Sequence, residues 1–223
     1  MSCPSPDAPV HAGRRRFLGA ASALAGMLGT PVLAQIGPTG AAEGGFDPSA
    51  VATDFWARPR TVWLRRPATG EEIRSTWWAD GRLIQPEYER LCWFLRDASL
   101  AKRIEDLRRA GQPVPASWYA AIGVSYVTLD ILYATNGWLE WFGMSRPLVV
   151  TSFFRHPVTN AVTEGAARNS RHQVGGAGDI VVPDVPASRV SAFGAWLRAG
   201  GIGFYPDKGF THVDDGRLRR WKG

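Results

Sequence analysis

Residues 169–182 read NSRHQVGGAGDIVV, and this stretch indicates both a core strand and a candidate metal site. Two side chains that can bind a metal, His172 and Asp179, flank a run of small residues at 175–178. Because glycine and alanine offer little steric obstruction, we expect this run to be a loop that folds back and brings both groups to one ion. The apolar residues 180–182 predict a core strand immediately afterwards.

Strand and helix patterns follow one another on both sides of this stretch, without an internal repeat. Apolar and alternating runs predict strands, whereas apolar residues at helical spacing between Pro, Gly or charged residues predict helices. The expected strands are 61–66, 72–78, 146–154, 180–182, 201–206 and 210–214, and the expected helices are 86–97, 99–109, 125–143 and 190–197. This order predicts an α+β fold with a small, mostly antiparallel sheet flanked by helices. A turn at Thr69 and Gly70 makes the first two strands an N-terminal β-hairpin.

The first 34 residues have the pattern of an export signal. Three arginines at 14–16 precede a stretch of small and apolar residues, and we expect cleavage between Ala34 and Gln35. Paired arginines before Phe-Leu are typical of a bacterial twin-arginine signal, and an ordinary secretory signal is the alternative. The stretch is short and rich in Gly and Ala for a membrane anchor, so we expect a periplasmic chain without stable membrane insertion. The alternative is that the signal is not cleaved and holds the chain at the membrane as an anchor.

The rest of the chain divides into a flexible linker at 35–53, rich in Gly, Ala and Pro, and a single domain at 54–223. Loss of residues 1–34 lowers the formal net charge from +6 to about +4, since that segment holds three arginines and one aspartate. A modest positive charge suits an anionic polymer such as a cell wall. No basic run with interleaved aromatic residues indicates a nucleic-acid partner. Cys92 has no cysteine partner after cleavage, so stability must come from the core or from a metal.

Histidine is scarce, which makes its positions informative. Beyond the signal the chain has His156, His172 and His212. A catalytic zinc site takes three His or Asp/Glu ligands and leaves a position open for water. His172, Asp179 and His212 would complete that set around one zinc ion. The alternatives are a chance pair at 172 and 179 and a core histidine at 212, and His156 is interpreted as a turn residue.

Two further charged residues are candidates for catalysis. In the strand FTHVD, His212 and Asp214 share a face because side chains alternate along a strand. Asp214 could therefore act as a general base, or bond a ligand imidazole from behind. Arg155 follows a core strand and could polarise a substrate carbonyl or bind a carboxylate, and a surface ion pair is the alternative.

Three blocks of the sequence resemble a known family: 151–160 (TSFFRHPVTN), 169–182 and 200–221 (GGIGFYPDKGFTHVDDGRLRRW). They are similar in order and spacing to blocks of the murein endopeptidase K family, which belongs with the zinc D-Ala-D-Ala dipeptidases and carboxypeptidases of bacterial walls. The segment TVWLRRPATGEEIRSTWWADGR at 61–82 also resembles the N-terminal hairpin of that family. The resemblance covers most of residues 60–221.

The resemblance implies a D-Ala-D-Ala peptidase-like fold with the zinc site on its sheet, and His172, Asp179 and His212 as the zinc ligands. It implies a water, activated by zinc, that attacks a peptide bond between D- or meso-amino acids in peptidoglycan stem peptides. Arg155 matches a substrate-binding or transition-state-stabilising arginine. The implied activity is a murein endopeptidase. A D,D- or L,D-carboxypeptidase and a catalytically inactive peptidoglycan-binding protein are the alternatives.

Three departures from the family pattern bear on the mechanism. Gly209 stands where the related dipeptidases carry an acidic residue, so the general base must come from elsewhere; Asp214 is the first choice and Asp207 the second. Phe153 replaces a glycine and is expected to crowd the cleft. The segment 99–124 is longer than the connection expected there and could form a lid or a partner surface.

Overall fold

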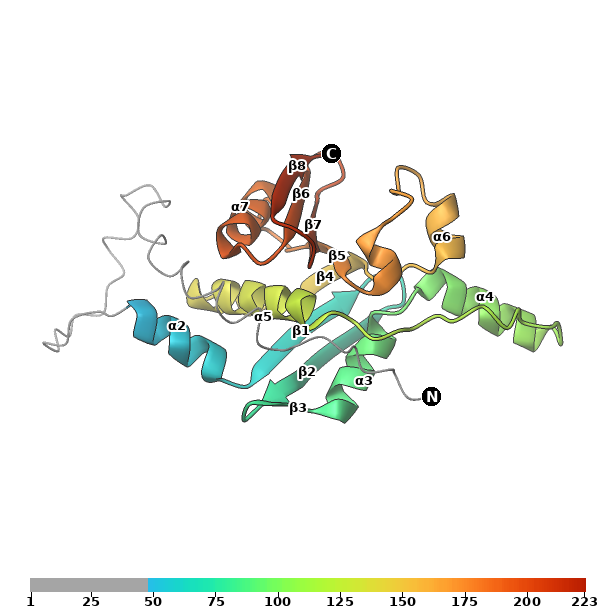
Figure 1. Cartoon of the computed structure of the whole chain (residues 1–223), viewed down its shortest axis with the longest axis horizontal. Coiled ribbons are helices and arrows are strands. Elements are labelled where there is room, and N and C mark those ends of the chain that lie inside the picture. The colour runs from blue at the N-terminus through green and yellow to red at the C-terminus, as the bar shows by residue number, and fades with distance from the viewer. Residues whose placement is uncertain (1–47) are drawn as a thin grey trace, which may run out of the picture.

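The computed structural model describes residues 48–223, which form an α+β fold around one eight-stranded mixed sheet (Figure 1). The strands are β1 (Arg60–Arg66), β2 (Glu71–Ala79), β3 (Arg82–Leu83), β4 (Leu148–Ser152), β5 (Ala177–Val181), β6 (Gly201–Tyr205), β7 (Phe210–Asp214) and β8 (Arg219–Lys222). The helices are α2 (Pro48–Ala57), α3 (Gln85–Phe94), α4 (Ala98–Arg109), α5 (Tyr126–Trp141), α6 (Pro157–Val162), α7 (Ala187–Leu197) and the 3-10 helix η3 (Arg171–Val174). The predicted signal, 1–34, lies outside the described residues.

The sheet order is β3-β2-β1-β4-β5-β7-β6-β8. Most neighbours are antiparallel, as predicted, but β1 pairs parallel with β4, and β6 pairs parallel with β8. The sheet is also larger than the small sheet expected from the sequence. The strand β8 was not predicted because RRWK at 219–222 is a short, charged segment without a run of apolar residues, a composition common in edge strands.

The first two strands pair antiparallel in the register Leu64 opposite Ile73. Their connection passes through Gly70 in the left-handed region (φ 71°), which glycine adopts without steric cost. Helix α2 begins at Pro48, so residues 48–53 of the predicted linker are helical. Residues 35–47 of that linker lie outside the part of the chain that the structure describes.

Helix α5 is the central helix of the core. Its residues Leu129, Leu132 and Leu139 are fully buried, as the apolar residues on several of its faces predict. The helix contacts β1 and α7, while α3 packs on β2 and α7 packs on β6 and β7. No helix among residues 48–223 is long and apolar enough to cross a membrane.

The strand β5 begins at Ala177, three residues earlier than predicted, so only Gly175 and Gly176 form the expected turn, and Ala177 and Gly178 belong to the strand. Gly175 ends η3 with φ 67°. Gly178 lies inside the strand, and a carbon added there would come within 2.8 Å of the Phe153 ring. These small residues have low strand propensity, which hid the strand in the sequence, but the close packing of Phe153 requires one of them.

Candidate metal centre

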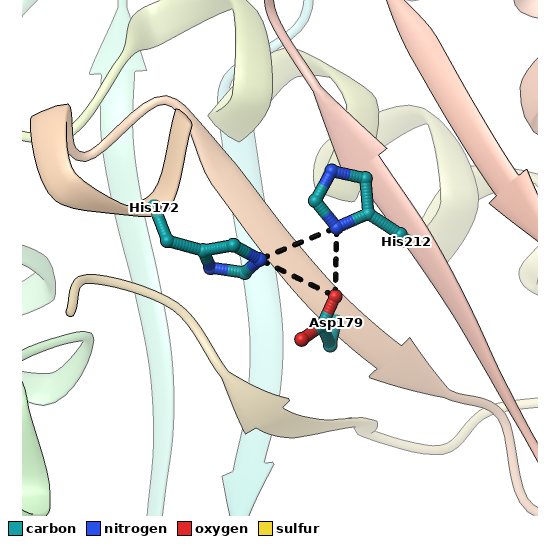
Figure 2. Close-up of side chains that lie close together, drawn as sticks. All are labelled: His172, Asp179 and His212. Carbon is teal, nitrogen blue, oxygen red and sulfur yellow. Dashed lines mark hydrogen bonds and ion pairs between the residues drawn. The ribbon is translucent and has the colours of Figure 1, made fainter. Parts of the chain in front are cut away.

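His172, Asp179 and His212 converge from three elements (Figure 2). His172 is on η3, Asp179 is inside β5, and His212 is inside β7. Because β5 and β7 are antiparallel neighbours with Asp179 directly opposite His212, the carboxylate and the second imidazole are held on adjacent strands. The helix η3 then brings the third group over them, at the N-terminal end of β5.

The three groups have the spacing of ligands around one ion. Nε2 of His172 lies 3.2 Å from Nδ1 of His212 and 3.4 Å from Oδ1 of Asp179, and Nδ1 of His212 lies 2.8 Å from that same oxygen. Tetrahedral ligands 2.0–2.1 Å from a zinc ion are about 3.3 Å apart, so the residues present fit a zinc ion. Two nitrogens and one carboxylate oxygen are also the donors zinc prefers.

The ring of His172 is fixed by its second nitrogen. Its Nδ1 donates to the carbonyl oxygen of Phe153 at 2.5 Å, which leaves the Nε2 lone pair facing Asp179. The side chain of Phe153 is fully buried against Gly178 and does not line the cleft. The expectation that Phe153 crowds the cleft is therefore wrong, because its ring points into the core.

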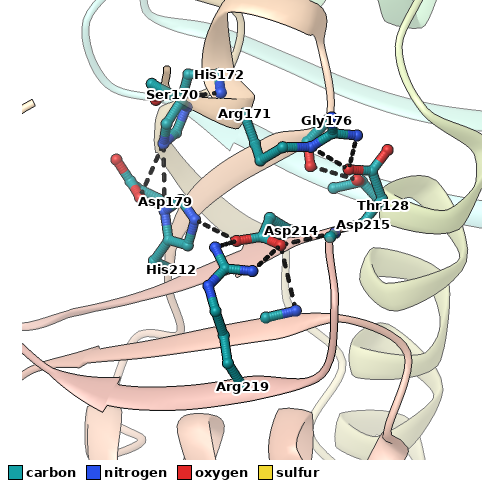
Figure 3. A network of polar contacts seen from close by, with 12 residues as sticks. Thr128, Ser170, Arg171, His172, Gly176, Asp179, His212, Asp214, Asp215 and Arg219 are labelled. Carbon is teal, nitrogen blue, oxygen red and sulfur yellow. Dashed lines mark hydrogen bonds and ion pairs between the residues drawn. The ribbon is translucent and has the colours of Figure 1, made fainter. Parts of the chain in front are cut away.

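His212 is fixed by Asp214 (Figure 3). Nε2 of His212 donates to Oδ2 of Asp214 at 3.1 Å, on the opposite side of the ring from Asp179. Asp214 is fully buried, and Arg219 donates to both of its oxygens, Oδ1 at 3.0 Å and Oδ2 at 2.5 Å. The amides of Gly201 and Gly216 donate to Oδ1 at 3.2 and 2.8 Å. The structure thus places Asp214 behind the imidazole, in the second of the two arrangements considered from the sequence.

The electrostatics of the cluster favour a bound cation. Burial lowers the pKa of His172 below its ordinary value, against the opposing effect of Asp179. Burial also lowers the pKa of His212, but hydrogen bonds to Asp179 and Asp214 outweigh it, and the net shift is upward. Burial raises the pKa of Asp179, yet its hydrogen bonds with the two histidines hold it well below its ordinary range. Asp179 is therefore an anion, and its charge faces both rings.

Arg155 contacts the cluster directly. Its Nη2 lies 3.3 Å from Oδ2 of Asp179, and its Nε donates to Oγ of Ser152 at 3.0 Å. One carboxylate oxygen of Asp179 thus faces the imidazoles and the other faces the guanidinium. Only 15% of the Arg155 side chain is exposed, so the surface ion pair considered as an alternative is excluded.

The cluster opens onto a cleft of about 610 Å³. One wall comes from β6 to β8 and carries Tyr205, Phe210 and Trp221. Trp221 donates from Nε1 to the hydroxyl of Tyr205 at 3.1 Å, and its ring centroid lies 5.3 Å from that of His212. The opposite wall comes from α6 and residues 163–171. The three clustered side chains therefore lie in a cleft rather than in the closed core.

His156 is buried but lies outside this cluster, as its interpretation as a turn residue implies. Its Nδ1 accepts from the amide of Val158 at the start of α6, and its Nε2 lies 3.1 Å from the carbonyl oxygen of Ser117. The ring of Tyr119 packs against it at 4.6 Å. His156 thus anchors the segment 110–124 beside the cleft.

Sequence reasoning missed Arg219 and Trp221. Both belong to β8, and only the placement of that strand beside β6 brings them to Asp214 and His212. The available signal was the alternation in RRWK, where residues 219 and 221 share one face. Gly209 lies in the β6–β7 turn with φ 69°, a conformation that glycine adopts without steric cost.

The chain is similar in sequence to several bacterial proteins. A peptidoglycan L,D-endopeptidase MepK of Escherichia coli (strain K12) is 32% identical over 177 residues, which cover 77% of this chain and 85% of that protein. The protein of the same name in Shigella flexneri has the same identity and coverage. A probable peptidoglycan L,D-endopeptidase MepK of Haemophilus influenzae is 42% identical over 74 residues, or 31% of this chain and 40% of that protein.

The family described as peptidoglycan L,D-endopeptidase MepK matches residues 134–221. The chain belongs to the MepK family. This confirms the resemblance to the murein endopeptidase K family. The segment of this chain that the family matches contains Arg155, the three clustered side chains and Asp214. No solved structure matches the chain.

Proposed function

We propose that this chain is a zinc-dependent peptidoglycan endopeptidase that cleaves cross-links between stem peptides. The observation that carries the proposal is the cluster of His172, Asp179 and His212, with ligand atoms 2.8–3.4 Å apart at the side of an open cleft. The similarity to proteins named peptidoglycan L,D-endopeptidase supports the substrate class.

The protein's own side chains have separable roles in this proposal. His172, Asp179 and His212 hold the ion, and the chemistry that zinc supplies when bound is polarisation of a carbonyl and a lower pKa of water. Asp214 orients His212 and stabilises its Nε2–H tautomer. Because Asp214 is fully buried and all its hydrogen bonds are made within the protein, we assign it this positioning role instead of the role of general base.

Arg155 is placed to bind the substrate carbonyl that becomes negatively charged during hydrolysis. Its guanidinium lies next to Asp179 and lines the cleft, and donors fixed at such a position stabilise developing charge. Asp179 and Ser152 hold it in place from two sides. Because Asp179 is also one of the clustered ligands, the arginine and the ion would act on the same bond.

The shape of the cleft favours an endopeptidase over a carboxypeptidase. The cleft continues beyond the clustered side chains in two directions, toward Tyr205 and Lys208 on one side and toward Arg66 and Ser99 on the other. A substrate can therefore extend past the reacting bond at both ends. A complete ligand set with an orienting partner for each histidine favours catalysis over simple wall binding.

The proposed site of action is the periplasm, reached after cleavage of the signal at 1–34 by the twin-arginine route. The motivating feature is the arginine run at 14–16 before an apolar stretch. Replacing both Arg15 and Arg16 with Lys would leave the protein in the cytoplasmic fraction. Periplasmic accumulation of that variant would exclude the twin-arginine route but not the activity.

Digestion of purified peptidoglycan tests the proposed activity. The zinc-loaded protein and the His172→Ala variant are each incubated with the polymer, and the released muropeptides are separated and identified. Monomers released from dimers, by the wild type alone, are the expected result. Shortened monomers would indicate a carboxypeptidase instead, and binding to the polymer without any new product would indicate an inactive wall-binding protein.

A further inference from the structure

A second buried arginine, Arg66, lies in the same cleft but takes no part in the cluster. It is the last residue of β1, is 3% exposed, and lines the cleft together with Arg155. Its Nη1 donates to the carbonyl oxygens of Phe94 at 2.8 Å and Arg96 at 2.5 Å, at and just after the end of α3. Within residues 48–223, its Nε and Nη2 have no hydrogen-bond partner.

The charge of Arg66 is also left without a direct counter-ion. No carboxylate among the described residues lies within ion-pairing distance of it, although Asp97 and Glu71 are near. Asp97 accepts from two backbone amides, one in α4 and one just before α6. Glu71 pairs with Arg96 at 3.0 Å. Burial, and then repulsion by Arg96, lower the pKa of Arg66 to about 10, so an added carboxylate would stabilise its charged form.

The start of α4 adds a second positive feature at the same place. Ala98 and Ser99, the first two residues of this 12-residue helix, line the cleft with Arg66. Amides in the first turn of a helix have no partner within the helix, and the helix dipole places partial positive charge there. Asp97 caps only the amide of Leu100. Asp97 also lines the cleft, but its two oxygens already accept from the amides of Leu100 and His156. An anion at this position would therefore face a guanidinium and the amides of Ala98 and Ser99.

We propose that Arg66 and the first turn of α4 form a carboxylate-binding subsite of the cleft, which holds a free carboxylate of the stem peptide. The subsite deepens the proposed function and rests on it. A guanidinium forms charge-assisted hydrogen bonds with a carboxylate, and Nη2 of Arg66 is available to donate one, since Nη1 already donates to two carbonyl oxygens. A carboxamide would lose the charge and one acceptor oxygen, so the subsite would discriminate against it.

The sheet places this subsite at a definite separation from the cluster. Arg65 is opposite Val149 on the parallel strand β4, and Ser152 on β4 is opposite Asp179 on β5. The Cα atoms of Arg66 and Asp179 are thus two strands apart, across a β-bulge in β4 between Val150 and Ser152, which corresponds to roughly 10–12 Å. An extended peptide covers that distance in about three residues. The bound carboxylate therefore belongs to a stem-peptide residue near, but not at, the bond that is cut.

The test uses synthetic cross-linked stem-peptide dimers, one with all carboxylates free and others with a single carboxylate converted to a carboxamide. The intact wild type is expected to cleave one of the amidated dimers with a kcat/KM about 10–100-fold lower, mainly through KM. In Arg66→Gln the ratio of kcat/KM for the free dimer to kcat/KM for the amidated dimer should fall close to unity. Arg65→Gln is the matched control, because its exposed side chain does not line the cleft, and it should keep the ratio.

Two results would overturn the subsite: equal cleavage of every dimer by the wild type, or full discrimination retained by folded Arg66→Gln. The wild-type comparison decides even if that variant fails to fold. If the wild type cleaves no dimer at all, the proposed function fails separately. Calorimetric binding of the free and amidated dimers to the wild type then decides the subsite, since equal affinities would contradict it and a weaker amidated dimer would support it.

Discussion

Nε2 of His212 lies 3.1 Å from Asp214, while Nδ1 of the same ring lies 2.8 Å from Asp179. The imidazole is therefore held between two carboxylates, one buried behind it and one beside it in the cleft. A ring held in this way cannot rotate without breaking a charge-assisted hydrogen bond. Its Nδ1 stays directed at the position that the other two ligand atoms share.

Asp214→Asn is expected to weaken zinc binding by about 10–100-fold, because the amide is a poorer acceptor for His212 and a poor partner for Arg219. Competition with a chromogenic chelator measures this affinity. The prediction separates the positioning role from the role of general base. Unchanged zinc affinity in a folded variant that has lost hydrolysis would mean that Asp214 is the base.

Arg219→Ala is expected to lower the free energy of unfolding by roughly 2 kcal/mol, because it leaves the fully buried Asp214 without its guanidinium partner. The cost is below that of a fully buried pair, since 34% of the Arg219 side chain is exposed and two amides still bond Asp214. Urea unfolding of the zinc-free protein measures it. Arg220→Ala, at the exposed neighbouring residue, is the control. An equal loss of stability in both variants would contradict the stabilising role of the pair between Arg219 and Asp214.

Gly178→Ala is expected to destabilise the protein by about 1–3 kcal/mol, because the added carbon would lie 2.8 Å from the buried ring of Phe153. Phe153 also supplies the carbonyl that orients His172, so zinc affinity should fall with stability. Thermal unfolding and the chelator competition together test this. An unchanged melting temperature would show that the ring moves aside freely.

Arg155→Gln is expected to reduce kcat by about 100- to 1,000-fold while zinc content stays unchanged, because the proposed role of the side chain is to bind the reacting carbonyl and it is not one of the three clustered side chains. Hydrolysis of a cross-linked muropeptide dimer and metal analysis of the same sample give both values. Loss of zinc along with activity would instead mean that Arg155 acts by holding Asp179 in place.

The sequence allowed the cluster to be predicted because each member stands in a local pattern. His172 and Asp179 flank small residues, and His212 lies in an alternating strand, so strand periodicity also placed Asp214 on its face. The start of β5 was predicted too late because Ala177 and Gly178 have low strand propensity, and Gly178 is required for close packing on Phe153. Tertiary packing overrode the local signal there.

Long-range contacts explain what could not be predicted. Arg219 reaches Asp214 only because β8 pairs parallel with β6, and the weak alternation in RRWK does not indicate which strand it pairs with. Arg66 reads as one of several exposed basic residues in the hairpin. It is buried because β4 and the end of α3 cover it, contacts that join residues far apart in the chain.

Metal content of the purified protein shows whether His172, Asp179 and His212 together bind a zinc ion. Elemental mass spectrometry is applied to the wild type and to His172→Ala, Asp179→Ala and His212→Ala, each shown to be folded by circular dichroism. We expect one zinc ion per wild-type chain and a large loss of zinc in all three variants. Full zinc occupancy in any folded variant, or hydrolysis of peptidoglycan by a wild type freed of every metal, would contradict it.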